Sequence, residues 1–116
     1  MRLSSIVRLL AIQGAAVLWL NPAICANTTA NEAMEGCRFF LTDTGHATLK
    51  QINAQGYCRG AVEALIVASY CPPDGVTIGQ AVRVVVQYVD NRPSRLNEVF
   101  AVLAGEALQV AWPCRR

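Results

Sequence analysis

Cysteine and histidine are the residues of this chain whose types could support covalent or metal chemistry. The chain holds five cysteines and a single histidine, His46. It contains no Cys-x-x-Cys or His-x-x-x-His pair, and a structural metal site requires closely spaced ligand pairs of this kind. A cysteine nucleophile would need a free thiol beside a base. We therefore expect no metal, no cofactor and no catalytic pair, with His46 in a solvated loop.

Residues 1–26 have the layout of a secretory signal peptide. Arg2 and Arg8 supply a short basic start, the run from 9 to 20 is predominantly apolar, and small residues precede position 27. The apolar run is shorter than the about 20 residues that span a bilayer, and an uncleaved anchor is the alternative. We expect cleavage near Ala26, which leaves residues 27–116 as one folded domain.

The charge of the chain argues against nucleic acid as a partner. The full chain has 10 Lys and Arg against 8 Asp and Glu, a formal net charge of +2. Arg2 and Arg8 belong to the expected signal peptide, so 10 − 2 = 8 basic residues face 8 acidic ones in the rest. Such a domain lacks the basic patch that holds phosphate backbones. We expect no nucleic acid partner and no membrane contact after signal cleavage.

The cysteine count predicts disulfides. Removal of residues 1–26 takes Cys25 away and leaves an even number of cysteines in a small exported chain. This composition indicates a disulfide framework, for which the count alone allows three connectivities. The remaining cysteines are Cys37, Cys58, Cys71 and Cys114.

The segment Cys71–Gln80 predicts a chain reversal between two helices. The double proline after Cys71 cannot continue a helix, and the Asp-Gly pair that follows is typical of a turn. Thr77 offers its hydroxyl to a new helix start, and Gln80 completes a capping box. Cys71 therefore stands at a corner, where it is well placed for a disulfide to a distant cysteine.

Apolar periodicity and capping residues predict four helices. The first three begin at Thr-x-x-Glu or Thr-x-x-Gln capping boxes, and the fourth is expected to begin at Ser94. In the fourth helix, the i, i+3, i+4, i+7 pattern predicts one apolar face that includes Val110 and Ala111. The helices are expected over about residues 29–41, 48–69, 77–90 and 94–111.

Two local alternatives accompany these helices. Gly56 and Gly60 lower helix stability by about 1 kcal/mol each relative to Ala. They either let a neighbouring helix approach closely or mark a bend near Gly56. The run Val84–Val89 could form a strand by propensity, although its capping box and its lack of strict alternation favour a helix.

Short connections between four helices predict an all-α fold, a small antiparallel bundle of four main helices stapled by two disulfides. In such a bundle the second and fourth helices run in the same direction, so Cys71 and Cys114 lie at the same end. Cys37, near the end of the first helix, faces the first half of the second helix, where Cys58 lies. The pairing Cys37–Cys58 and Cys71–Cys114 is therefore favoured.

Three motifs indicate a known family. They are Cys58-Arg59-Gly60, then Cys71-Pro72-Pro73-Asp74-Gly75-Val76-Thr77 with Gln80, and finally Trp112-Pro113-Cys114. Over roughly residues 35 to 114, the chain resembles the resistance-associated/type VI amidase immunity family, called Rap/Tai. It departs from the usual pattern at Ala61 and Ala64, where the family has an aromatic residue and a glycine. Arg92 stands where a histidine is common.

The resemblance implies a small, exported, disulfide-stabilised all-α protein of the periplasm, often a homodimer. Members of the family bind a cell-wall amidase delivered by type VI secretion and block its active site. Such amidases cleave peptidoglycan stem peptides with a cysteine–histidine pair, and the immunity protein protects the producing cell and its kin. We therefore expect a homodimeric binding protein with an amidase effector as its partner, and not an enzyme.

The stiff connections between the helices supply the candidate partner-binding residues. Proline stiffens the connections at residues 72–76 and 90–97, and a pre-organised loop loses little entropy when it enters a cleft. Arginine there could donate forked hydrogen bonds to a partner. Alternatively these charges are ordinary solvated loop residues, and Tyr88 and Trp112 are expected to pack internally. The candidates are Asp74, Asp90, Arg92, Pro93 and Arg95.

A second hypothesis assigns the chain to a different class, a periplasmic structural or stress-protective protein without a toxin partner. A broad apolar belt on the expected helix at residues 77–90 could bind unfolding client proteins. Such a holdase would suppress aggregation of unrelated proteins. An inhibitor would instead form a stoichiometric complex with one amidase.

Overall fold

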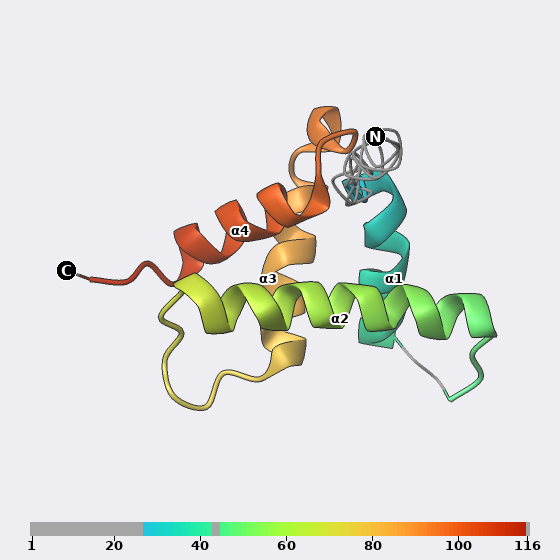
Figure 1. Cartoon of the computed structure of the whole chain (residues 1–116), viewed down its shortest axis with the longest axis horizontal. Coiled ribbons are helices and arrows are strands. Elements are labelled where there is room, and N and C mark those ends of the chain that lie inside the picture. The colour runs from blue at the N-terminus through green and yellow to red at the C-terminus, as the bar shows by residue number, and fades with distance from the viewer. Residues whose placement is uncertain (1–26, 43–44, 116) are drawn as a thin grey trace, which may run out of the picture.

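Four α-helices and one short 3₁₀ turn make up the part of the chain that the computed structural model describes, residues 27–42 and 45–115 (Figure 1). No strand occurs in this part, and only an isolated bridge joins Thr29 to Val99. The all-α prediction is therefore confirmed. The expected signal peptide lies outside the described residues. The elements are α1 (Ala30–Thr42), α2 (Leu49–Ser69), α3 (Ile78–Asp90), η1 (Pro93–Arg95) and α4 (Phe100–Ala111).

The long helix α2 is the element around which the others are arranged. In Figure 1, α1 and α3 run across α2 in opposite directions, whereas α4 runs towards the same end as α2. α1 packs mainly on α2, and α3 packs mainly on α4. The C-terminal ends of α2 and α4 therefore meet, as the sequence predicted.

Hydrogen bonds between a threonine and the residue three positions later mark the starts of the first three helices. At α2 the capping box is complete, because the Thr48 hydroxyl accepts from the Gln51 backbone N–H and the Gln51 side chain accepts from the Thr48 N–H. Thr77 caps α3 by accepting from the Gln80 N–H at 3.1 Å. At α1 the Glu32 carboxylate accepts from the Thr29 N–H at 2.8 Å, and this hydrogen bond lowers the pKa of Glu32. These polar contacts account for the accurate prediction of three helix starts.

The start of the fourth helix was predicted wrongly. Ser94 lies within η1, and α4 begins only at Phe100, with no side-chain cap. The reason is a long-range pairing, since the carbonyls of Leu96 and Glu98 accept from the first N–H groups of α1, each at 2.9 Å. Phe100 in turn donates its N–H to the Thr28 carbonyl. The turn that follows η1 is therefore held against the start of α1, and only Val99, directly before Phe100, has extended backbone.

The hydrophobic core lies where all four helices meet. Phe100, Leu103 and Leu108 of α4 are fully buried together with Met34 of α1. α3 is a helix rather than the alternative strand. Its apolar belt packs into the core of the domain. Its residues Ala81, Val82, Val85 and Val89 are all buried.

The glycines of α2 do not make the predicted close approach. α2 is continuous through Gly56 and Gly60, without a break, and a Cβ atom at either position would meet nothing within 4 Å. The close approach is instead made by Gly36 of α1, where a Cβ atom would overlap the backbone of Ala54 in α2. The close approach expected at Gly56 and Gly60 was therefore wrong, and the alternative break near Gly56 does not occur.

Both predicted disulfides are present, and they lie in contrasting environments. Cys37–Cys58 joins α1 to α2, and both of its residues are completely buried. Cys71–Cys114 links the segments that follow α2 and α4 across 43 residues of sequence, and both of its residues are exposed. Among the helices described, none has the length and apolar character needed to cross a membrane.

Candidate partner-binding surface

The junction of α3, η1 and α4, which we call the α3–α4 corner (residues 88–98), holds most of the predicted binding residues. α3 ends at Asp90, and the Asn91 N–H closes it by donating to carbonyls of the last turn. Pro93 then starts η1, because its fixed φ suits the first position of a helical turn. The corner therefore brings together Asp90, Arg92, Pro93 and Arg95.

Asp74 does not belong to this corner. It is exposed in the turn that precedes α3, where Gly75 has a positive φ of 85°. A helix rises about 1.5 Å per residue, so α3 with its 13 residues separates Asp74 from the corner by roughly 20 Å. The predicted residues thus occupy the two opposite ends of α3, not one surface.

Arg95 is the centre of the ionic contacts at the corner. Its guanidinium donates to both carboxylate oxygens of Glu98, at 2.8 and 2.7 Å, and to both oxygens of Glu106, at 2.6 and 3.0 Å. The Tyr88 hydroxyl also donates to Glu106, at 2.9 Å. Arg95 therefore ties η1 to α4, and its donors are engaged within the domain.

These contacts shift the acidity of the groups involved. The hydrogen bonds from Arg95, and secondly that from Tyr88, lower the pKa of Glu106 from 4.5 to about 2. The hydrogen bonds from Arg95 likewise lower the pKa of Glu98. Glu98 and then Glu106 raise the pKa of Arg95 further above its usual value. The three groups therefore remain charged at neutral pH, and their hydrogen bonds join η1 to α4.

Arg92 is arranged differently from Arg95. Its guanidinium lies over the Tyr88 ring, 3.6 Å from the ring centre, and donates one hydrogen bond to the Tyr88 carbonyl at 2.9 Å. No carboxylate in the described part of the chain lies within ion-pair distance of Arg92. The cation–π contact therefore fixes the side chain, and the charge of Arg92 also contributes to the lowered pKa of Glu106 without forming a hydrogen bond to it.

Asp90 pairs with α1 at the edge of the corner. Its carboxylate accepts from Arg38 at 2.5 Å, although the two side chains are 44 and 53% exposed. Exposed ion pairs of this kind add little stability because water screens them. The contact nevertheless orients Asp90 towards the C-terminal half of α1.

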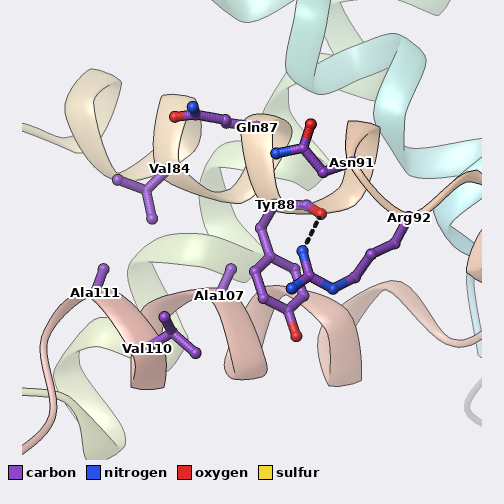
Figure 2. Close-up of a pocket in the computed structure, with 8 residues that line it drawn as sticks. All are labelled: Val84, Gln87, Tyr88, Asn91, Arg92, Ala107, Val110 and Ala111. Atoms are coloured by element: carbon purple, nitrogen blue, oxygen red, sulfur yellow. Dashed lines mark hydrogen bonds between the residues drawn. The ribbon is translucent and has the colours of Figure 1, made fainter.

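A groove adjoins the corner along the contact between α3 and α4, with a volume of about 310 Å³ (Figure 2). Figure 2 shows Arg92 folded over Tyr88 on the α3 side, and Val110 on the α4 side. Sequence periodicity placed Val110 and Ala111 on the buried face of the fourth helix, but both are exposed, Val110 by 72%. The groove is lined by Val84, Gln87, Tyr88, Asn91, Arg92, Ala107, Val110 and Ala111.

The sequence carried only a weak signal for this groove. Val84 lies outside the core stripe of its helix, whereas Val110 lies on the stripe that periodicity predicts, and a single helix does not show which of its residues a neighbour leaves uncovered. Tyr88 and Trp112 behave as predicted, since both are half-buried and pack against the core.

The described residues offer little for covalent or metal chemistry. His46 is exposed in the connection before α2, and Cys37, Cys58, Cys71 and Cys114 are all in disulfides. Residues 27–42 and 45–115 contain no group of three or more His, Cys, Asp or Glu that could hold a metal ion. The corner and the groove instead present the Arg92 guanidinium, held in place over Tyr88, beside apolar surface.

The described residues form a small disulfide-bonded helical domain of the all-α class, with polar and apolar surface side by side at its corner. The comparisons with known proteins then give the family, because a family model for Rap1a immunity proteins matches residues 29–114. The chain belongs to the Rap1a immunity protein family, as the resemblance predicted. Membership implies an immunity protein that acts against a secreted effector. Neither the search of curated proteins nor that of solved structures returned a match to the chain.

Proposed function

We propose that this chain is a periplasmic immunity protein that binds a peptidoglycan amidase delivered by type VI secretion and blocks its active-site cleft. The observation that carries the proposal is the family match over residues 29–114, which spans all four helices and both disulfides. The protein acts as a non-catalytic inhibitor, and protection follows from occupying the cleft.

The α3–α4 corner is the element that we propose enters the cleft. Arg95 and its two carboxylate partners keep the corner rigid, so its binding to the effector requires little loss of conformational freedom. Arg92 and Asp90 then present charges of both signs around Pro93. Asp74, at the far end of α3, would contact only an effector that reaches along the whole helix.

Two features support the periplasm as the compartment. Residues 1–26 have the layout of a signal peptide, which we propose is removed to leave residues 27–116 as the mature domain. Disulfides persist in oxidising compartments, and Cys71–Cys114 is exposed to whatever reductant the compartment contains.

We also propose that the mature protein is a homodimer. Leu49 and Ile52 lie one turn apart at the start of α2, and they are 74 and 47% exposed. A second hollow, which includes Ile52 and Phe40, lies beside them. Isologous pairing of two copies would remove this apolar surface from water. Light scattering on the wild type and on Ile52→Lys tests it, and equal masses for the two proteins would refute this surface.

The stress-protective alternative receives no comparable support. It was based on a broad apolar belt along α3, and the packing of the domain accounts for that belt, since Val82, Val85 and Val89 are fully buried. Aggregation of unrelated proteins in the presence of a molar excess of the chain is the measurement that distinguishes the two functions.

The decisive experiment for the inhibitor is capture followed by enzymology. The immobilised mature protein should retain a cysteine amidase from extracts of cells that carry an active type VI system. The purified pair should form a saturable complex in which peptidoglycan cleavage is abolished at stoichiometric ratio. Arg92→Gln should weaken inhibition, whereas Arg83→Gln, an exposed α3 arginine away from the corner, should not. Undiminished cleavage at saturation would refute the proposed function.

A further inference from the structure

The groove between α3 and α4 has exposed apolar residues along its α4 side. Val110 is 72% exposed and Ala111 is exposed, and they face Val84 of α3 across the groove (Figure 2). A volume of about 310 Å³ is sufficient for one or two side chains of a partner. The exposure of these residues makes the groove shallow, which suits an extended chain better than an enclosed small molecule.

Arg92 gives one end of the groove its charge. Its stacking on Tyr88 and its hydrogen bond to the Tyr88 carbonyl hold the guanidinium at the groove lining. Glu106, the nearby acid of α4, accepts from Arg95 and Tyr88, and Arg92 acts on it only through its charge, with no hydrogen bond between them. No described carboxylate forms an ion pair with Arg92. Arginine recognises carboxylates by paired hydrogen bonds, so its natural complement is an acidic group from outside the domain.

We propose that the α3–α4 groove binds an extended segment of the effector that carries an aliphatic side chain next to a carboxylate. The aliphatic side chain packs on Val84 and Val110, and the carboxylate accepts from Arg92. The amides of Gln87 and Asn91, which line the α3 side, provide donors and acceptors for the backbone of the segment. This inference rests on the proposed function and adds the chemistry of the partner.

The composition of the groove argues against a second copy of this chain as the occupant. A two-fold interface brings the same surface of two copies together, so Arg92 of one copy would need a carboxylate on the equivalent surface of the other. The residues that line the groove include no Asp or Glu. A partner with complementary charge therefore fits better than self-association.

The test uses a random peptide library displayed on phage and selected on the immobilised mature protein. We expect enriched peptides in which Leu, Ile or Val stands within two residues of Asp or Glu. Their affinity, measured as free peptides, should fall at least about tenfold for Val110→Asp and for Arg92→Gln. Val67→Asp, an 84% exposed valine in the last turn of α2, and Arg83→Gln are the matched controls and should bind normally.

Each other outcome is informative. Enriched peptides without acidic residues, or no enrichment at all, would overturn the inference. Equal peptide binding by the wild type and by Val110→Asp, which circular dichroism should show to be folded, would overturn it as well. A dimer that becomes monomeric in Val110→Asp would also overturn it, because a second copy would then occupy the groove. Full inhibition of the amidase by Val110→Asp and Arg92→Gln would remove the inference and leave the proposed function intact. If acidic peptides bind in the groove but the protein inhibits no amidase, the groove chemistry is supported and the proposed function is refuted.

Discussion

Gly36 of α1 lies directly against the backbone of Ala54 in α2. A Cβ atom at position 36 would overlap the Ala54 carbonyl group, which cannot move without disturbing the α2 helix. One residue further along α1, Cys37 forms its buried disulfide with Cys58. The glycine and the disulfide thus set the same helix–helix contact from adjacent positions.

The first prediction concerns the two kinds of glycine in this domain. Gly36→Ala should destabilise the protein by at least about 1–3 kcal/mol, because the added methyl overpacks the contact between α1 and α2. Gly60→Ala should stabilise it by about 0.5–1 kcal/mol, since the site is helical and open. Denaturant unfolding of the oxidised proteins measures both changes. Equal effects of the two substitutions would contradict the contact described.

The second prediction concerns the disulfide between the ends of α2 and α4. Cys114→Ser removes a link across 43 residues, which lowers the free energy of unfolding by up to about 4 kcal/mol in the chain-entropy model. Thermal melting under non-reducing conditions checks it. The wild type, denatured without reductant, should show no free thiol after signal removal. An unchanged melting curve for the variant would count against the bridge.

The third prediction concerns the order in which the two disulfides are reduced. Under native conditions a limiting thiol reductant should open Cys71–Cys114 first, because both residues are exposed, and leave the fully buried Cys37–Cys58 intact. Alkylation at successive times, followed by peptide mapping, gives the order. In Gly36→Ala the Cys37–Cys58 bridge should become more accessible to the reductant. Simultaneous reduction of both bridges in the wild type would show that global unfolding precedes thiol attack.

The fourth prediction concerns pH. The pKa of Glu106 is lowered from 4.5 to about 2 in the folded protein, so its contribution to stability is complete above about 4.5. That contribution is lost as the pH falls from about 4.5 through about 2. The melting temperature of Glu106→Gln should therefore lie below that of the wild type at pH 7, and the gap should close on acidification. Glu35→Gln, an exposed change without an ion pair in the described structure, is the control.

The sequence predicted features that depend on neighbouring residues and missed those set by distant ones. Thr48 and Thr77 each cap a helix by a hydrogen bond to the residue three positions later, so both helix starts were predicted correctly. The start of α4 depends on backbone pairing with Thr28, which lies some 70 residues earlier in the chain and leaves no local pattern. The pairing Cys71–Cys114 was predictable because helix direction brings the C-terminal ends of α2 and α4 together.

The binding surface was harder to predict for the same reason. The charges at Asp90, Arg92 and Arg95 look alike in the sequence, and only their tertiary neighbours distinguish them. Arg95 is occupied by Glu98 and Glu106, whereas Arg92 is left beside an apolar groove. The exposure of Val110 could not be inferred either, because periodicity gives the face of a helix but not the extent of the neighbour that covers it.

The pairing between the first described residues and the start of α4 has a consequence for export. Thr28 accepts from Phe100, and Ala30 donates to Glu98, each at 2.9 Å. With removal of residues 1–26, as proposed, only Asn27 separates the new terminus from this pairing. We expect such processing to come before Phe100 donates to Thr28, because a cut so close to Thr28 requires this segment to be free of α4.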